Sequence, residues 1–163
     1  MTDPAAADPP TDAPQSFPSV EDRERIHALL HEYCFRLDAG DLDGVAALFE
    51  DAIVVSTRDP ETVHEGAAAV RTMYEPVILY PDGTPRTQHR LANITLTRGR
   101  PGEVRSRASF QVLQQVDESR IEVILAGEYH DTVARDADGS WHFRRRTIDP
   151  RLIGDLSRHM RTR

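Results

Sequence analysis

The second half of the chain alternates between apolar and polar residues over four long stretches, and this alternation limits the fold more than any other feature. The stretches cover residues 87–98, 103–116, 120–135 and 141–148. A period of two with one wetter face is typical of antiparallel strands that cover a core on one side only. Asp138-Gly139, between the last two stretches, predicts a hairpin turn.

The part of the chain before these strands has helical spacing. Residues 20–39 are predicted to form a helix, because apolar side chains recur every three to four positions from Ile26 to Leu37. Ser19 is a suitable cap at the start of this helix, and Gly40 is a suitable residue to end it. Shorter elements are expected at 42–49 (helix), 52–56 (strand), 58–61 (turn) and 66–74 (helix).

Helices followed by antiparallel strands predict an α+β domain, in which three N-terminal helices pack on a curved, mostly antiparallel sheet. The first 18 residues are rich in Pro, Ala and Asp and contain one aromatic residue. Such a composition does not bury enough apolar surface to order itself, so residues 1–18 are expected to be a disordered tail. Residues 19–163 are then expected to form a single domain.

Composition excludes several classes of function. The formal net charge is −7, which argues against nucleic acid as a partner, because phosphate binding needs a basic surface. All 20 basic residues are arginine, so Schiff-base chemistry and a lysine-anchored cofactor are excluded. One cysteine allows no internal disulfide and no cysteine-based zinc cluster. No apolar run reaches the roughly 20 residues of a membrane span, and no secretory signal is evident, so a cytoplasmic protein is expected.

Four segments together resemble the SnoaL-like families of the nuclear transport factor 2 superfamily. They are Tyr33-x4-Asp38, AGDLDGVAALFEDA, TQHRLANITL and GEYHDTVARDADGSWHFRRR. The resemblance implies a cone-shaped SnoaL-like fold with a pocket between helices and sheet. Members of the superfamily include polyketide cyclases, dehydratases, steroid isomerases, a dehydrochlorinase, dioxygenase β subunits and binding modules, so the fold does not select one function.

The resemblance also implies a set of site residues. An Asp–His pair in the dehydratase and dehydrochlorinase branches corresponds here to Asp38 and His89, and the tyrosine of the dehydratases corresponds to Tyr33. An arginine on the last strand, five residues after its tryptophan, corresponds to Arg146. Asn93 is four residues after His89, so regular alternation places it on the same strand face as a second substrate-binding candidate.

The chemistry of these groups is coherent without the family. Imidazole, with an ordinary pKa near 6.5, is well suited to remove a proton at neutral pH, and a carboxylate on its other nitrogen stabilises the imidazolium. A phenol or a guanidinium can stabilise the negative charge that then develops. This set needs no metal and no cofactor, and none is expected. It suits proton abstraction followed by elimination, double-bond migration or ring closure.

Each candidate also has a purely structural interpretation. Asp38 can face water at its helix end, His89 can be an ordinary strand histidine, and Tyr33 can be a core residue with a satisfied hydroxyl. Simple alternation from Trp141 turns Arg145 inward and Arg146 outward, opposite to the resemblance, and a bulge in the arginine triplet would reconcile the two. We expect Arg146 to face inward.

Two functions remain from the sequence. The first is a cofactor-independent lyase or isomerase that acts on a small, largely apolar carbonyl compound of polyketide, steroid or terpenoid type. The second is a non-catalytic ligand-binding module or a structural subunit like a dioxygenase β subunit. Strand 103–116 lacks the second His or Asp with which dehydratases of this type protonate a leaving hydroxyl, which argues against dehydration. A homodimer is the expected assembly.

Overall fold

The structure, a computed structural model, describes residues 17–161. Three helices precede most of the sheet: α1 (Val20–Ala39), α2 (Leu42–Ala47) and α3 (Gly66–Met73). The predicted start of α1 is confirmed, because the Ser19 hydroxyl accepts a hydrogen bond from the Asp22 amide at 3.1 Å. The disordered tail predicted for residues 1–18 lies almost wholly outside the described residues. Of it, Phe17 is described, and the Arg23 guanidinium lies 4.7 Å from its ring centroid.

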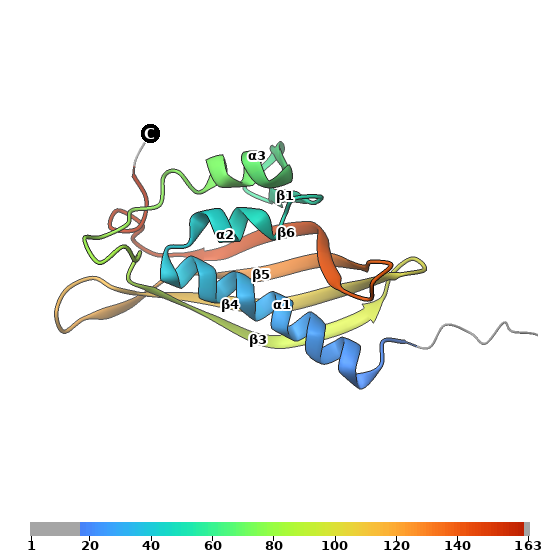
Figure 1. Cartoon of the computed structure of the whole chain (residues 1–163). Coiled ribbons are helices and arrows are strands. Elements are labelled where there is room, and N and C mark those ends of the chain that lie inside the picture. Colours follow the sequence, from blue (N-terminus) through green and yellow to red (C-terminus); the bar gives the residue numbers. More distant parts are fainter. Residues whose placement is uncertain (1–16, 162–163) are drawn as a thin grey trace, which may run out of the picture.

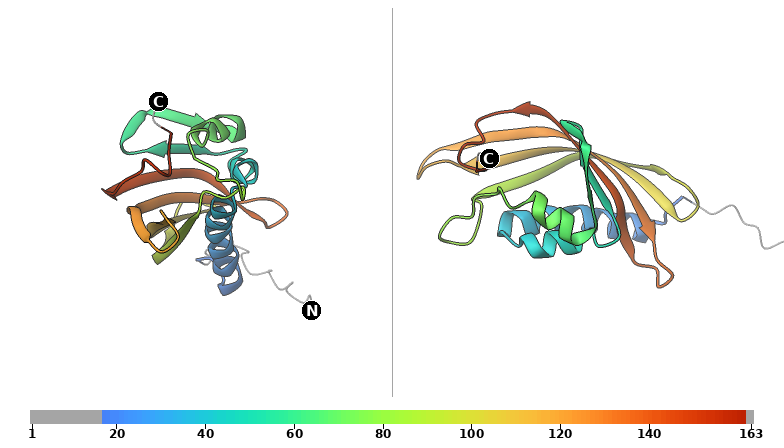
Figure 2. Two further views of the ribbon diagram at one scale, coloured as in Figure 1. Left: turned by 90° about the vertical axis from the view of Figure 1, so that its left-hand side faces the viewer. Right: turned by 90° about the horizontal axis from the view of Figure 1, so that it is seen from above.

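A six-stranded open sheet forms the other layer (Figures 1 and 2). Its strands are β1 (Ile53–Ser56), β2 (Asp59–Glu65), β3 (Thr87–Arg98), β4 (Glu103–Gln115), β5 (Ile121–Arg135) and β6 (Trp141–Ile153). Their spatial order is β2-β1-β6-β5-β4-β3, and only β1 and β6 pair in parallel. The predicted α+β class, with helices on a curved and mostly antiparallel sheet, is confirmed.

Two parts of the sheet differ from the sequence prediction. The expected turn at 58–61 is shorter, because β2 begins at Asp59 and pairs with β1 in spite of Pro60. Strand β6 continues five residues beyond Ile148, through Pro150. Pro150 has no amide to donate, but it lies beside a register shift next to Gly127, where the regular ladder is already interrupted.

Helices α1 and α2 lie against one face of the sheet, and the core fills the space between these layers (Figure 2). The apolar stripe of α1 is buried there, from Ile26 to Leu37. The opposite sheet face carries exposed apolar side chains, including Ile121, Val123 and Leu152. Within the described residues, no helix is both long enough and apolar enough to cross a membrane.

After β6 the chain returns to the end of the molecule where α1 ends and β3 begins (Figure 1). We call residues 155–161 the C-terminal strap. The strap is held by backbone hydrogen bonds to the loop before β3: the Ile78 amide donates to the His159 carbonyl at 2.8 Å, and the Arg161 amide donates to the Pro76 carbonyl at 2.8 Å. Val77 and Met160 form an isolated bridge.

Candidate active site

The Asp38 carboxylate and the His89 imidazole meet at the end of α1. His89 Nδ1 donates to Asp38 Oδ1 at 2.6 Å, the His89 amide donates to Oδ2 at 2.7 Å, and the Thr87 hydroxyl donates to Oδ1 at 2.9 Å. The side chains of His89 and Asp38 are only 8% and 19% exposed. The predicted contact is therefore confirmed, and three donors compensate the carboxylate for its partial loss of water.

Local structure explains why these two side chains meet. Strand β3 is at the edge of the sheet, so some of its amides have no partner strand, and Asp38 accepts a hydrogen bond from one of them. Gly40 ends α1 with a φ of 74°, and a Cβ there would lie 2.1 Å from the Gly83 carbonyl oxygen. Only glycine therefore lets the helix end fit against the loop that leads into β3.

Because a carboxylate can only accept hydrogen bonds, Nδ1 of His89 carries a proton in this contact. In the neutral ring the lone pair is then on Nε2, which is the nitrogen able to take a proton from a substrate. The arrangement is that of a general base whose tautomer is set by a neighbouring carboxylate.

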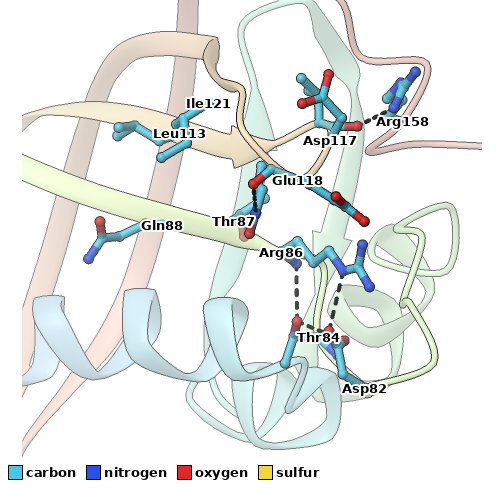
Figure 3. A pocket seen from close by; sticks show the side chains of 12 residues that line it. Asp82, Thr84, Arg86, Thr87, Gln88, Leu113, Asp117, Glu118, Ile121 and Arg158 are labelled. Atoms are coloured by element: carbon cyan, nitrogen blue, oxygen red, sulfur yellow. Dashed lines mark hydrogen bonds and ion pairs between the residues drawn. The ribbon is translucent and has the colours of Figure 1, made fainter.

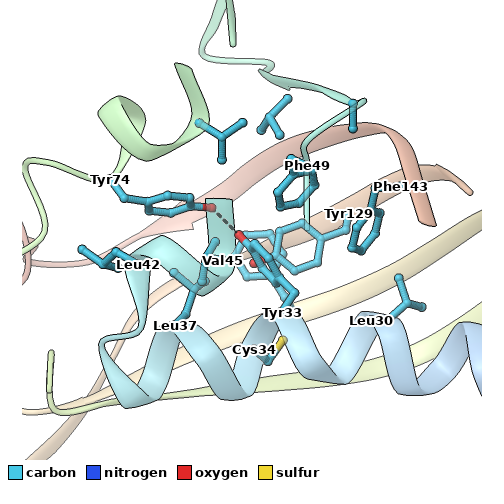
Figure 4. Close-up of a cluster of buried hydrophobic side chains, with 14 of the residues drawn as sticks. Leu30, Tyr33, Cys34, Leu37, Leu42, Val45, Phe49, Tyr74, Tyr129 and Phe143 are labelled. Atoms are coloured by element: carbon cyan, nitrogen blue, oxygen red, sulfur yellow. Dashed lines mark hydrogen bonds between the residues drawn. The ribbon is translucent and has the colours of Figure 1, made fainter. Parts of the chain in front are cut away.

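Tyr33 precedes Asp38 by five residues on α1 and lies in the aromatic part of the core (Figure 4). Its hydroxyl is 2.7 Å from the Tyr74 hydroxyl, and its ring meets Phe49 and Tyr129 edge-on. Burial raises the pKa of both phenols, so both are neutral hydrogen-bond donors at neutral pH. The structure describes no direct contact between Tyr33 and the Asp38–His89 pair.

Arg146 is the largest fully buried side chain and lies in the same aromatic cluster. Its Nε and Nη2 atoms each donate to the Asp131 carboxylate at 2.8 Å, and its guanidinium carbon is 4.0 Å from the Tyr33 ring centroid. Burial lowers the pKa of Arg146, but the adjacent Asp131 charge outweighs this effect and raises it above the usual value. Nη1 is buried and has no hydrogen-bond partner among the described residues.

The inward direction of Arg146 results from a bulge in β6. Thr132 pairs with Arg145 but Val133 pairs with Phe143, so Arg144 is the extra residue. Phe143 and Arg146 are consequently both buried, whereas Arg144 and Arg145 are exposed. The bulge that the resemblance required is confirmed, and simple alternation was wrong. The role of Arg146 in ligand binding stays a prediction.

The expected position of Asn93 was wrong. A register shift between Ala92 and Thr95 interrupts β3, and Asn93 has a positive φ of 53° within it. Its side chain is exposed and its amide nitrogen is 3.3 Å from the Ser109 hydroxyl. Because one extra residue reverses the faces beyond it, the four-residue spacing from His89 does not bring Asn93 to the site.

Comparison with known proteins decides the family. The sequence matches the SnoaL-like domain over residues 18–147, which is most of the chain. The chain belongs to the SnoaL-like family. This is the family that the four sequence segments resemble.

Solved structures agree with this SnoaL-like assignment. One is a Novosphingobium aromaticivorans protein that is provisionally named a scytalone dehydratase. It is 25% identical to this chain, the match covers 83% of this chain and 88% of that chain, and the TM-score is 0.66. ActVI-ORFA from Streptomyces coelicolor is 21% identical, with 78% and 96% covered and a TM-score of 0.67. The β subunit of a provisionally named aromatic-ring-hydroxylating dioxygenase from N. aromaticivorans is 16% identical, with 85% and 95% covered and a TM-score of 0.64.

Cys34 is on the buried face of α1 in this SnoaL-like protein, one residue after Tyr33 and four residues before Asp38. Burial raises the pKa of its thiol to about 12; the Asp38 and Asp131 charges act in the same direction, and Arg146 opposes them. The thiol is therefore protonated at neutral pH and is not a candidate nucleophile. Cys34 is buried and belongs to the hydrophobic core cluster.

His159, on the C-terminal strap, is a site residue that the sequence did not reveal. Burial, and after it the charge of the nearby His89, lower the pKa of its imidazole to about 4, although Asp38 acts in the opposite direction. The ring therefore lies within electrostatic range of the Asp38–His89 pair. Residues after Ile148 showed no clear periodicity, so nothing in the sequence placed them near the end of α1.

The lowered pKa of His159 predicts a specific pH dependence of stability. Between its ordinary value of 6.5 and about 4, the unfolded chain binds a proton at this position and the folded chain does not. The free energy of unfolding therefore falls as the pH falls through that window. His159→Gln should reduce this acid-side loss by about 2 kcal/mol relative to the unchanged protein. Urea unfolding at several pH values between 4 and 7 measures it, and parallel curves for both proteins would refute the prediction.

An open groove of about 760 Å³ lies close to this end of the molecule, between the loop before β3, the β4–β5 hairpin and Arg158 (Figure 3). Thr87 lines the groove and also donates to Asp38. Neither Asp38 nor His89 lines it, so the groove is not the candidate active site. Among residues 17–161, no group of three His, Cys, Asp or Glu side chains is arranged to hold a metal ion.

Proposed function

We propose that this SnoaL-like protein is a cofactor-independent lyase or isomerase, which uses His89 as a general base on a small, largely apolar carbonyl compound of polyketide, steroid or terpenoid type. The observation that carries the proposal is the 2.6 Å hydrogen bond between His89 Nδ1 and Asp38. It supplies the two properties that a base needs, a defined tautomer and a counter-charge for the imidazolium.

In the proposed reaction, His89 Nε2 takes a proton from the carbon next to the substrate carbonyl. The C–H electron pair forms the enolate, and the negative charge moves to the carbonyl oxygen. Asp38 stabilises the imidazolium that results. The enolate then expels a leaving group, takes the proton back at another carbon, or attacks a second carbonyl to close a ring. All three outcomes share the first step, and the residues present support that step.

Tyr33 and Arg146 are proposed to stabilise the enolate charge. Nη1 of Arg146 is buried and has no hydrogen-bond partner among the described residues. A hydrogen bond from Nη1 to a ligand oxygen would remove the free-energy cost of this unpaired donor and so favour binding. Tyr33 shares its hydrogen bond with Tyr74, so one of the two hydroxyls is free to donate to a third group. The surrounding aromatic rings favour an apolar ligand body.

A solvent-exchange experiment tests the proposal directly. 2-Tetralone is an apolar bicyclic ketone with exchangeable hydrogens next to its carbonyl. In D₂O, the protein should accelerate deuterium incorporation well above the rate in buffer, as followed by proton NMR. A rate equal to that in buffer would contradict the proposal.

The second candidate is a non-catalytic subunit, and the structural similarity to a dioxygenase β subunit favours it. It predicts that the chain co-purifies with a larger partner and does not accelerate exchange. The catalytic proposal predicts a protein that is stable on its own. The expected homodimer and the expected cytoplasmic location stay predictions, and sedimentation equilibrium measures the first of them.

A further inference from the structure

The C-terminal strap is anchored at the same end of the sheet as the Asp38–His89 pair. The Arg158 carbonyl accepts hydrogen bonds from Gln114 Nε2 at 3.1 Å and from the Tyr80 hydroxyl at 2.9 Å. Gln114 pairs with Thr87 across β4 and β3, and Thr87 donates to Asp38. The strap is therefore joined to the candidate base through a short chain of direct contacts.

Two buried polar atoms at this end lack hydrogen-bond partners among residues 17–161. They are Oε1 of Gln114, whose side chain is fully buried on the inner face of β4, and Nδ1 of His159. Buried polar atoms are rarely left unpaired, because the loss of water is then uncompensated. One acceptor and one imidazole nitrogen therefore lack partners within the described residues at the end of the sheet that carries the candidate base, and a polar ligand group bound there would supply them.

The charge of His159 decides what it can contribute. Its pKa is lowered to about 4 by burial and then by His89, with Asp38 acting in the opposite direction. At neutral pH the ring is uncharged, and repulsion from a protonated His89 contributes to this. A neutral imidazole is a poor source of a proton for a leaving hydroxyl, but it has one N–H that can donate to an oxygen with growing negative charge.

We propose that His159 is a further catalytic residue, a neutral imidazole that donates a hydrogen bond to the substrate oxygen while His89 removes the proton. This inference rests on the proposed function of the Asp38–His89 pair. It places a further hydrogen-bond donor for the substrate oxygen on the C-terminal strap, in addition to Tyr33 and Arg146, and leaves the missing acid of β4 unreplaced. Burial strengthens such a hydrogen bond, because no water competes for the oxygen.

The test uses the full chain with 2-naphthol, an aromatic analogue of the enol of 2-tetralone. His159→Leu keeps a similar volume and removes the donor, whereas His159→Gln keeps an N–H donor. We expect His159→Leu to weaken 2-naphthol binding at least tenfold and to slow 2-tetralone exchange mainly through kcat. His159→Gln should remain within about threefold of the unchanged protein in both measurements. Arg161→Gln, on an exposed side chain of the same strap, is the matched control.

The outcomes separate a donor from a merely structural residue. Equal loss in His159→Leu and His159→Gln, no loss in either, or no binding of 2-naphthol by the unchanged protein would each overturn the inference. If exchange is lost in His89→Ala but is normal in His159→Leu, the proposed function of the Asp38–His89 pair stands and the catalytic role of His159 is wrong. Exchange that persists in His89→Ala would remove the proposed function itself.

Discussion

Replacing His89 by alanine is expected to abolish protein-dependent deuterium exchange into 2-tetralone and to leave the fold intact. The imidazole is the proposed base, and general-base groups contribute typically about 10²–10⁴-fold to rate. Its side chain contacts Asp38 at the sheet edge and is not part of the buried core cluster. The variant should therefore keep a cooperative thermal transition, measured by circular dichroism, while its exchange rate falls to that of buffer.

Asp38→Asn tests the second half of the pair. An amide at this position can donate to the imidazole, so it permits the tautomer in which Nε2 carries the proton and cannot act as a base. Loss of the counter-charge also destabilises the imidazolium, and we expect exchange to slow by about 10²–10⁴-fold.

Thr87→Val is the matched control for the pair. It removes one of the three donors to Asp38 and leaves the imidazole contact in place. We expect only a few-fold loss of exchange. Activity equal to that of the unchanged protein in both His89→Ala and Asp38→Asn would place the chemistry elsewhere in the molecule.

Replacing Arg146 by glutamine is expected to lower the free energy of unfolding by about 3–5 kcal/mol. Arg146 and Asp131 are both fully buried, and the variant leaves the carboxylate with the Ser106 hydroxyl as its one side-chain partner among residues 17–161. An uncompensated buried charge is costly, whereas an exposed arginine contributes little. Arg145→Gln, one residue away but exposed, should change the free energy by less than about 0.5 kcal/mol.

Urea denaturation of both variants at neutral pH measures this difference. The double variant Arg146→Met with Asp131→Leu should recover most of the lost stability, because apolar side chains can replace a buried ion pair at little cost. Two equally stable single variants would mean that the ion pair is not the reason for the burial of Arg146. On the functional side, Arg145→Gln should leave 2-naphthol affinity unchanged and Arg146→Gln should weaken it.

Local spacing determined the secondary structure with few errors. Strand β3 and helix α1 have the bounds predicted from alternation, helical periodicity, the Ser19 cap and Gly40. These signals are local, because capping and periodicity depend on residues within a few positions of one another. The errors at β2 and β6 both involve a proline that regular pairing would exclude and that an edge strand or a register shift tolerates.

The sequence also determined the Asp38–His89 pair, although only through resemblance to a family. Two residues separated by 51 positions give no signal of contact by themselves. The contact depends on α1 ending at Gly40 beside the first residues of the edge strand β3. Spacing within each element was regular there, so the family pattern could be transferred without a shift in register.

Only the tertiary structure decided three further features. A one-residue bulge turned Arg146 inward and so decided between the family resemblance and simple alternation, which the sequence had left in conflict. A second bulge turned Asn93 outward, because an inserted residue exchanges the two faces of every position beyond it. The C-terminal strap brought His159 to the site through backbone hydrogen bonds to the loop before β3. Such bonds use groups that every residue type carries, so no pattern of side chains in the sequence announces them.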